Sequence, residues 1–178
     1  MAVLPIRVFG DPVLRERARG VDKITAVHRR LVNDMFETMR AAPGVGLAAP
    51  QVGILERIFV WEVDDVAGAV INPRITRRST ETAIEDEGCL SLPGLVYGVE
   101  RPFEVRLEGL DEHGRPVSLD ADELTARVFQ HELDHLDGVL FVDRLAEGAR
   151  RDALRQLNAL VLGLPADPAA RAEPGEAL

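Results

Sequence analysis

The sequence predicts a mixed α and β protein with one buried helix, and three kinds of pattern carry this prediction. Residues 25–42 repeat apolar side chains at helical spacing, which predicts an amphipathic scaffold helix. Residues 58–63 and 103–110 have the composition and alternation of strands. Residues 120–138 predict a second helix whose apolar stripe faces the core. The length of 178 residues fits one domain with a sizeable core.

Strands are predicted in the middle of the chain. Residues 58–63 form a β-branched and aromatic run, and residues 69–76 indicate two short strands around a kink at Asn72-Pro73. The strand of residues 103–110 alternates with period two, as a half-buried strand does. A hairpin turn follows it, and residues 116–119 are expected to return as its partner.

The helix of residues 120–138 has a predicted beginning, end and buried side. Asp120 is expected to cap its start, with Glu123 reaching back, and Gly138 is expected to end it. Its stripe follows the spacing i, i+4, i+7, i+11 and consists of Leu124, Val128, His131 and His135. Two histidines on a core-facing stripe need hydrogen-bond or metal partners.

The C-terminal part of the chain predicts a helix and then a tail. Residues 147–162 have helical spacing, with Arg150, Arg151 and Arg155 near the start. Residues 165–178 are rich in Ala, Pro, Asp and Glu and predict a disordered acidic tail. We therefore expect one catalytic domain over residues 1–164.

Composition and charge limit the kinds of partner. The net charge of −9 argues against binding DNA through the global field, although a local basic face is compatible with it. No secretory signal is visible at the N-terminus, and no run of about 18 apolar residues predicts a membrane span. We expect a cytoplasmic protein. Cys89 is the only cysteine, so no intramolecular disulfide can form.

His131 and His135 stand four positions apart, and Glu132 directly follows the first of them. On a helix, positions i and i+4 share a face, so both imidazoles can bind one metal ion. Glu132 lies further round the helix and can reach a metal-bound water without coordinating the ion. Two ligands, a water and a proton carrier are the components of metal-assisted hydrolysis. An ordinary exposed helix surface without a metal is the alternative interpretation.

A catalytic metal site of this kind uses a third protein ligand. On residue type alone, Cys89, His28, His113 and the many carboxylates are all open. Cys89 is attractive because a thiolate is a strong soft ligand and because Gly and Pro residues bound its segment. A buried structural cysteine is the alternative.

Residues 43–53 predict a functional loop. They contain three glycines and two prolines, which argues against regular structure and allows close approach of a ligand to the backbone. A phosphate-binding loop is disfavoured because no Gly-Lys-Ser/Thr follows. A simple tight turn is the alternative, but Gln51 places a side-chain amide donor within an apolar stretch.

Three segments of the chain together resemble the bacterial peptide deformylases. They are Gly44-Val45-Gly46-Leu47-Ala48-Ala49-Pro50-Gln51, Glu87-Gly88-Cys89-Leu90-Ser91 and Gln130-His131-Glu132-Leu133-Asp134-His135-Leu136. Their order and spacing match as well, and the resemblance covers about residues 5–162. One segment alone would be suggestive, whereas the three together are highly specific.

The resemblance implies a hydrolase that removes the formyl group from N-formylmethionine of newly synthesised polypeptides and releases formate. It implies Cys89, His131 and His135 as ligands of one divalent metal ion. Iron, as Fe2+, is the usual metal of such enzymes, and Zn2+, Ni2+ or Co2+ can occupy the site. With a metal-bound water as nucleophile, Glu132 would act as general base and then as general acid towards the leaving amine.

The resemblance also implies how the substrate is held. Gln51 and the backbone N–H of Leu90 would stabilise the formyl oxygen as it gains charge. Methionine is unbranched and apolar, so a narrow hydrophobic slot beside the metal is expected. The implied substrate-binding residues are Val45, Gly46, Glu87, Gly88, Leu124 and Val128.

The implied fold is α+β, with antiparallel β-sheets wrapped around the central helix and the N-terminal and C-terminal helices outside. N-formylmethionyl peptides are the implied substrates, met at the ribosome near the tunnel exit, with no membrane partner. There, Arg150, Arg151 and Arg155 could touch RNA phosphates. Asp134 would be buried in the helix motif and needs a partner, for which Arg101 is the expected residue.

Two alternatives remain open at the level of sequence. A metallopeptidase that cuts internal peptide bonds would take its third ligand downstream, where Glu147 is available but no histidine follows His135. A binding module without activity would be expected to lack a ligand or Glu132, and this chain has all of them.

Overall fold

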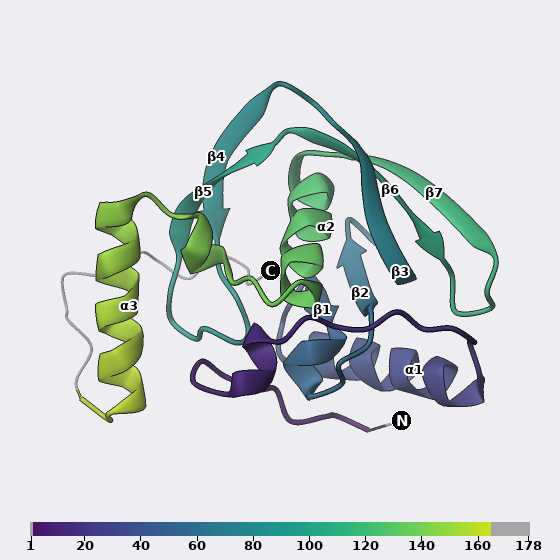
Figure 1. Cartoon of the computed structure of the whole chain (residues 1–178), viewed down its shortest axis with the longest axis horizontal. Helices are drawn as coiled ribbons and strands as arrows, with labels where there is room; N and C mark the ends of the chain where they lie inside the picture. The colour runs from purple at the N-terminus through teal and green to yellow at the C-terminus, as the bar shows by residue number, and fades with distance from the viewer. Residues whose placement is uncertain (1, 165–178) are drawn as a thin grey trace.

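The computed structural model describes residues 2–164, and in this part of the chain two antiparallel sheets surround one helix. Helix α2 (Glu123–Leu136) lies beneath the arch of strands, while α1 (Ala26–Ala41) and α3 (Glu147–Val161) lie outside it (Figure 1). The α+β fold with a central helix and two outer helices is thereby confirmed. The predicted tail of residues 165–178 lies outside the described residues.

The larger sheet has five strands in the order β1–β2–β3–β6–β7, and the smaller one pairs β4 with β5. The strand bounds are β1 Gly46–Ala48, β2 Ile58–Val63, β3 Val66–Arg78, β4 Thr82–Glu87, β5 Tyr97–Pro102, β6 Glu104–Leu110 and β7 Pro116–Asp122. Short 3₁₀ helices span Pro12–Arg15, Ala49–Val52 and Phe141–Arg144. Within residues 2–164, no helix has the length and apolar character needed to cross a membrane.

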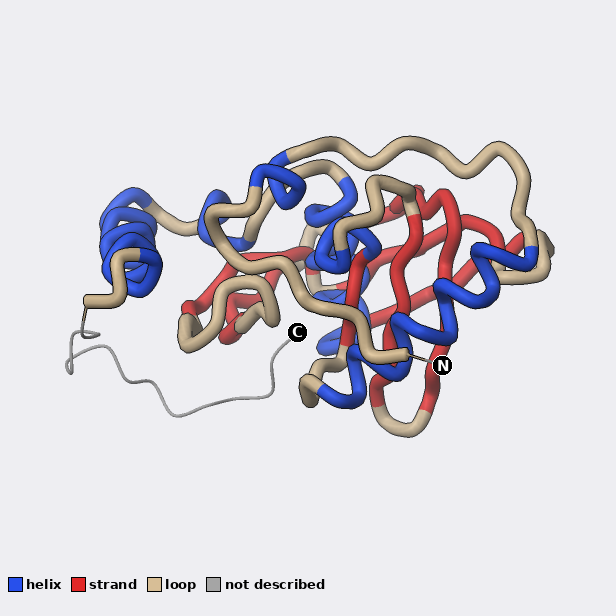
Figure 2. The backbone as a smooth tube through the Cα atoms, turned by 90° about the horizontal axis from the view of Figure 1, so that it is seen from below, coloured by secondary structure: helices blue, strands red, loops and turns tan. Residues whose placement is uncertain are grey.

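Strand β2 is buried on both faces because helices cover both sides of the larger sheet. Phe59 packs into the core cluster that contains Phe129 of α2. Val60 points to the opposite face and packs into the cluster that contains Met35 of α1. Successive side chains of a strand point to opposite faces, so one strand can serve both clusters. Figure 2 shows α1 lying across the strands of this sheet.

Strand β3 corrects the prediction of two short strands around a kink. It runs without interruption from Val66 to Arg78, and its pairing with β6 shifts in register between Ile71 and Arg74. Asn72 lies in this irregularity with a φ of 54°. Its side chain accepts a hydrogen bond from the Val21 N–H at 2.8 Å and donates one to the Val21 carbonyl at 2.9 Å. The kink is therefore real, but it is a bulge within one strand.

The sequence pattern did not predict β4 and β5, although they carry part of the site. The outward side of this two-stranded sheet is largely polar or exposed, and even Ile84 is 72% exposed. On the inward side, two of the three buried positions hold the charged residues Glu87 and Arg101, and only Val99 is apolar. The usual alternation of apolar and polar residues is consequently hidden.

Helix α2 ends as predicted but begins differently. Gly138 follows the helix with a φ of 74°, and a Cβ there would lie 2.6 Å from the carbonyl oxygen of Arg15. Asp120 does not cap the start, because it belongs to β7 and its carboxylate pairs with Arg106 of β6. Leu124 is 37% exposed in the first turn, whereas Val128 is fully buried. The predicted core-facing stripe is therefore wrong at Leu124 and begins one turn later.

Replacing Phe129 by alanine should destabilise the fold by about 3–5 kcal/mol, because a buried aromatic ring would leave a cavity. The ring is 1% exposed, with centroid distances of 5.9 Å to Phe59 and 5.1 Å to Trp61. Chemical denaturation would measure the free energy of unfolding. Ile84→Ala on the exposed face is the control and should change it by less than about 0.5 kcal/mol. Equal stability of the two variants would contradict this account of the core.

Candidate active site

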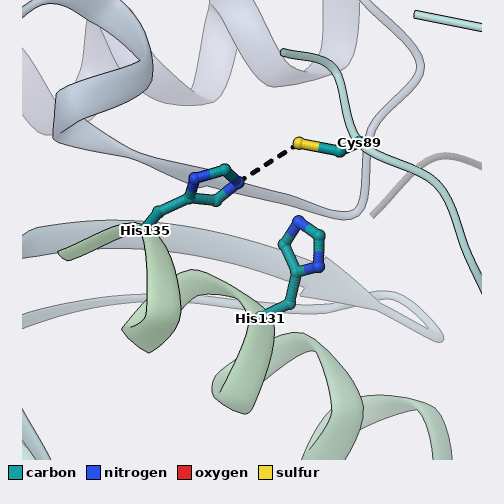
Figure 3. Close-up of side chains that lie close together, drawn as sticks. All are labelled: Cys89, His131 and His135. Carbon is teal, nitrogen blue, oxygen red and sulfur yellow. Dashed lines mark hydrogen bonds between the residues drawn. The ribbon is translucent and has the colours of Figure 1, made fainter. Parts of the chain in front are cut away.

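Helix α2 and the loop after β4 bring three metal-ligating side chains together. His131 and His135 lie one turn apart on α2 with ring centroids 4.9 Å apart, and each is 1% exposed. Cys89 enters from the loop between β4 and β5, and its Sγ lies 3.2 Å from Nε2 of His135 (Figure 3). The potential ligand atoms of the three residues all lie within 4.8 Å of one another. The structure thus joins the helical pair to the expected cysteine.

The donor set of this cluster fits a metal ion. One thiol and two imidazoles are ligands that zinc and iron accept. His131 Nε2 is buried without a hydrogen-bond partner, and Figure 3 shows the His131 ring beside the Cys89–His135 pair. Burial lowers the pKa of His135 well below its usual value, which favours the neutral, ligating form. For His131, burial is outweighed by Cys89 and Glu87, which raise the pKa, and a metal ion would replace that proton.

The two other histidines and Glu147 lie away from the cluster. His28 is near the start of α1, with Nε2 3.3 Å from Glu56, and His113 is in the exposed hairpin turn beside Glu112. Glu147 has a side chain that is 83% exposed and pairs with Arg151 on α3. The internal peptidase with Glu147 as ligand therefore has no support in the geometry, because Glu147 does not join the buried cluster.

The loop that presents Cys89 is anchored by its own packing. Cys89 is 3% exposed and belongs to a core cluster with Leu92 and Phe141. The Leu92 N–H donates to the Cys89 carbonyl at 2.9 Å, which closes a turn around the thiol. The Phe9 N–H donates to the Ser91 carbonyl at 2.8 Å. The N-terminal segment therefore holds this loop against the body of the protein.

Glu132 is a buried carboxylic acid without a compensating partner. It is fully buried, and neither of its carboxylate oxygens has a hydrogen-bond partner among the described residues. Burial raises the pKa of Glu132 to about 7. A group with such a pKa can take up and return a proton near neutral pH. Gly46 of β1 lies directly against it, since a Cβ on Gly46 would be 2.4 Å from Glu132 Oε1.

The Gly/Pro-rich loop places Gln51 beside the cluster. Gln51 is fully buried, and its Oε1 accepts a hydrogen bond from the Ala48 N–H at 2.7 Å. This bond fixes the amide so that Nε2 lies 3.7 Å from Cys89 Sγ and 3.3 Å from Ser91 Oγ. Leu90 directly follows Cys89, so its backbone N–H belongs to the same loop. Gln51 and Leu90 are thus near the metal cluster, and their role as donors to the formyl oxygen stays a prediction.

Glu87 contacts a metal-ligating histidine, while its expected role as a substrate neighbour stays a prediction. It is fully buried, and its Oε2 lies 3.0 Å from His131 Nδ1. Burial opposes its ionisation, but hydrogen bonds from Arg101 and His131 lower the pKa of Glu87 well below its usual range. A carboxylate bonded to the second nitrogen of a ligating histidine fixes the ring and its tautomer. The Glu87 side chain therefore contacts His131 and neighbouring arginines.

The expected pairing of Asp134 with Arg101 is confirmed. Arg101 Nη1 donates to Asp134 Oδ2 at 2.7 Å, and both residues are buried. Arg144 also donates to Asp134, from the exposed side. Asp134 thus links the helix that carries both histidines to β5 and to the segment after α2.

The implied pocket residues are distributed over two sides of the cluster. Val45 packs against the core cluster that contains Val128, and Gly46 follows Val45 at the start of β1. Gly88 is buried beside Cys89. Leu124 lies two turns before His131 at the exposed end of α2. Their contact with substrate stays a prediction.

Sequence reasoning missed Arg127, which is buried one turn before His131 and bonded to Glu87. Its spacing from His131 along the sequence could have indicated this role. Arg127 is at i−4 from His131, so it shares the face of the helix that carries the histidines. A charged residue on a core-facing stripe calls for a buried partner.

A buried thiol and two imidazoles beside an unpartnered carboxylic acid are the arrangement of a mononuclear metal-dependent hydrolase. Comparison with known proteins makes this more specific. The family model described as polypeptide deformylase matches residues 3–151. A peptide deformylase of Acidothermus cellulolyticus is 52% identical over 158 residues, which are 89% of this chain and 87% of the relative.

Solved structures agree with the family match and with this relative. The peptide deformylase of Thermus thermophilus is 47% identical with a TM-score of 0.85, over 90% of this chain and 96% of that one. The enzyme of Ehrlichia chaffeensis in complex with actinonin is 37% identical with a TM-score of 0.86, over 90% of this chain and 98% of that one. The chain belongs to the polypeptide deformylase family. The resemblance and the expectation of an enzyme are both confirmed.

Gly46→Ala should lower deformylase activity about 10²-fold while the protein keeps its metal. The new Cβ would lie 2.4 Å from Glu132 Oε1 and 2.9 Å from Glu132 Cδ, so the carboxylate has to move. The metal-ligating atoms are not among these contacts. Formate release and metal content would be measured on the same sample. Gly148→Ala, where a Cβ meets nothing within 4 Å, is the control. Wild-type turnover of Gly46→Ala would show that the position of Glu132 is not critical.

Proposed function

We propose that this protein is a metal-dependent peptide deformylase that removes the formyl group of N-formylmethionine from newly synthesised polypeptides and releases formate. The observation that carries the proposal is the Cys89–His131–His135 cluster with the unpartnered Glu132 next to it. Membership in the polypeptide deformylase family supports the substrate class.

In this proposal Cys89 Sγ, His131 Nε2 and His135 Nε2 hold one divalent ion, for which we propose Fe2+ in the cell and Zn2+, Ni2+ or Co2+ as substitutes. When bound, the ion supplies a Lewis acid that makes water a stronger acid and polarises the formyl oxygen. Glu87 keeps His131 Nε2 available by accepting the hydrogen bond of Nδ1.

Glu132 carries the proton in both halves of the reaction. It accepts a proton from the water whose oxygen attacks the formyl carbon, and a C–O bond forms. It then donates that proton to the methionine nitrogen as the C–N bond breaks, so that formate and a free amine leave. Burial raises the pKa of Glu132 to about 7, which suits a group that has to accept and return a proton.

Gln51 and Leu90 stabilise the charge that develops on the formyl oxygen. Gln51 Nε2 is preorganised because its Oε1 is fixed by the Ala48 N–H. Donors held in place before the reaction need no reorganisation as charge develops. The backbone N–H of Leu90 is the second donor in this proposal.

The methionine side chain occupies an apolar slot beside the cluster. We assign Val128, which is fully buried on the face of α2 that carries His131, to its floor. Val45 and Gly46 form the side next to Glu132, and the edge strand β1 offers backbone groups to an extended peptide. Gly88 and Leu124 complete the assignment, with the half-exposed Leu124 at the mouth. The catalytic domain comprises residues 1–164 in this proposal, because Ala153 and Leu157 of α3 are buried in the Cys89 cluster.

Glu132→Gln should retain the metal but lose about 10²–10⁴-fold or more in turnover, because an amide cannot accept the proton of water. Metal content and formate release from a formyl-Met peptide would be measured on each variant. His135→Ala is the matched comparison and should lose the metal together with the activity. A metal-loaded Glu132→Gln enzyme that turns over near the wild-type rate would overturn the mechanism.

We further propose that the enzyme works in the cytoplasm and meets its substrates at the ribosome near the tunnel exit. Arg150, Arg151 and Arg155 of α3 are the proposed contacts with RNA phosphates. The Arg151 and Arg155 side chains are 73% and 77% exposed. All three pair with acidic side chains, Asp143, Glu147 and Asp152, so phosphates would have to displace these partners.

Changing Arg150, Arg151 and Arg155 together to glutamate should reduce co-sedimentation with ribosomes, most clearly at low salt. The control changes Lys23, Arg29 and Arg30, three exposed cations in and before α1, to glutamate and alters the net charge equally. Co-sedimentation that is unchanged in the α3 variant, or reduced equally in both, would exclude a specific role of this helix.

A further inference from the structure

Arg127 has a buried guanidinium group that makes four hydrogen bonds, and it lies one turn before His131 on α2. Its side chain is 3% exposed. Nη1 donates to Glu87 Oε1 and to the Val99 carbonyl, each at 2.8 Å. Nη2 donates to the Ala83 carbonyl at 3.0 Å, and Nε donates to Glu85 Oε2 at 3.3 Å. Arg127 thus joins α2 to both strands of the smaller sheet.

The partners of Glu87 are arranged symmetrically on its two oxygens. Oε1 accepts from Arg101 Nε at 2.8 Å and from Arg127 Nη1 at 2.8 Å. Oε2 accepts from Arg101 Nη2 at 2.9 Å and lies 3.0 Å from His131 Nδ1. Each oxygen is therefore engaged twice, which leaves the carboxylate little freedom to rotate. The position of His131 depends on a carboxylate that Arg127 helps to hold.

Two attachments of the smaller sheet to α2 flank His131 along the helix. Arg127 lies four residues before His131 and bonds to Glu87 of β4. Asp134 lies three residues after His131 and accepts a hydrogen bond from Arg101 of β5 at 2.7 Å. If Arg127 is lost, Glu87 loses its hydrogen bond to the helix before His131. The contacts of α2 with β5 that remain are Gln130 Nε2 to the Pro102 carbonyl, at 3.0 Å, and Asp134 to Arg101, and Gln130 does not contact Glu87. Glu87 can then shift relative to the helix that carries the imidazole.

We infer that Arg127 is a positioning residue: through Glu87 it fixes the orientation of the His131 imidazole and so determines how tightly the Cys89–His131–His135 site holds its ion. This inference rests on the metal site of the proposed function and assigns to Arg127 a role in that site. Removing the partner of a ligating histidine typically weakens metal binding about 10–100-fold. Arg127 acts one contact further out, on the partner itself.

The first test measures zinc binding by the whole protein. Zinc-loaded wild-type enzyme and Arg127→Met would be titrated with a chelator, and the released zinc would be measured with a chromogenic indicator. Methionine fills much of the same volume but donates no hydrogen bonds. We expect zinc affinity to fall about 10-fold or more.

Arg57→Met is the matched control for loss of an arginine bonded to α2. Arg57 Nη1 donates to Asp137 Oδ1 at 2.7 Å and to the Leu136 carbonyl at 3.4 Å, at the opposite end of the helix. It has no contact with Glu87. Zinc affinity should stay at the wild-type value in this control. An unchanged affinity in Arg127→Met, or an equal loss in both variants, would overturn the inference.

A double-mutant cycle with Glu87→Gln separates positioning from general loosening of the fold. If Arg127 acts through Glu87, adding Arg127→Met to Glu87→Gln should weaken zinc binding much less than it does in the wild type. Additive losses in zinc affinity would mean that Arg127 does not act through Glu87, which would overturn the inference.

Arg127→Lys keeps the test decisive where the methionine variant does not fold. Lysine keeps the charge but lacks the planar fork that reaches Glu87 and two carbonyls at once. We expect weaker zinc binding and a shifted nuclear magnetic resonance signal of the His131 Nδ1 proton in the zinc-loaded protein. Unchanged affinity together with an unchanged signal would overturn the inference. A wild-type protein that binds no zinc, or that needs no His135 to bind it, would instead refute the metal site itself.

Discussion

The carboxylate of Glu87 has no exposed surface, so its charge has to be balanced inside the protein. Burying an isolated charge costs so much desolvation free energy that buried carboxylates occur with oppositely charged or hydrogen-bonding partners. Arg101 of β5 and Arg127 of α2 supply the balance, and the His131 imidazole occupies the remaining position. The smaller sheet, the helix and the metal cluster therefore meet at one side chain. Removing either arginine would leave part of the Glu87 charge unbalanced and would also weaken the contact between α2 and the smaller sheet.

Glu132 lies next to His131 on the same helix but experiences the opposite environment. Where Glu87 receives hydrogen bonds from two arginines, neither oxygen of Glu132 has a partner in the described part of the chain. Burial without compensation raises its pKa to about 7, while compensation lowers the pKa of Glu87 well below the usual range. One carboxylate is thereby kept charged for a fixed role, and the other is poised to exchange a proton. Gly46 contributes by leaving room where any Cβ would press on Glu132.

The features predicted from the sequence were those encoded locally. The His131–His135 pair follows from helical periodicity, and the end at Gly138 follows from a left-handed position that favours glycine. Asp120 was assigned to the wrong element because its partner, Arg106, belongs to a neighbouring strand that spacing along the chain does not reveal. Strands β4 and β5 were missed for a related reason. Two of their three buried positions hold Glu87 and Arg101, and a pattern that looks for apolar residues cannot recognise a buried ion pair.

The position of Cys89 beside the histidines is a part of the site that the local sequence pattern does not predict. The two histidines lie one helical turn apart, so little further conformational entropy is lost in bringing them together once α2 has formed. Cys89 reaches them only because β4 and β5 pair, the loop between them turns at Leu92, and the thiol packs in a cluster with Phe141. The third ligand is consequently a product of tertiary structure.

An ion held by all three residues would join the β4–β5 loop to α2, so its binding energy would also stabilise the packing that forms the site. Arg127 and Arg101 connect α2 to strands β4 and β5, which flank this loop, without a metal. The ion pairs of these two arginines can thus keep α2 and the smaller sheet in their relative positions before the metal ion binds. The orientation of His131 therefore depends on residues that do not contact the metal.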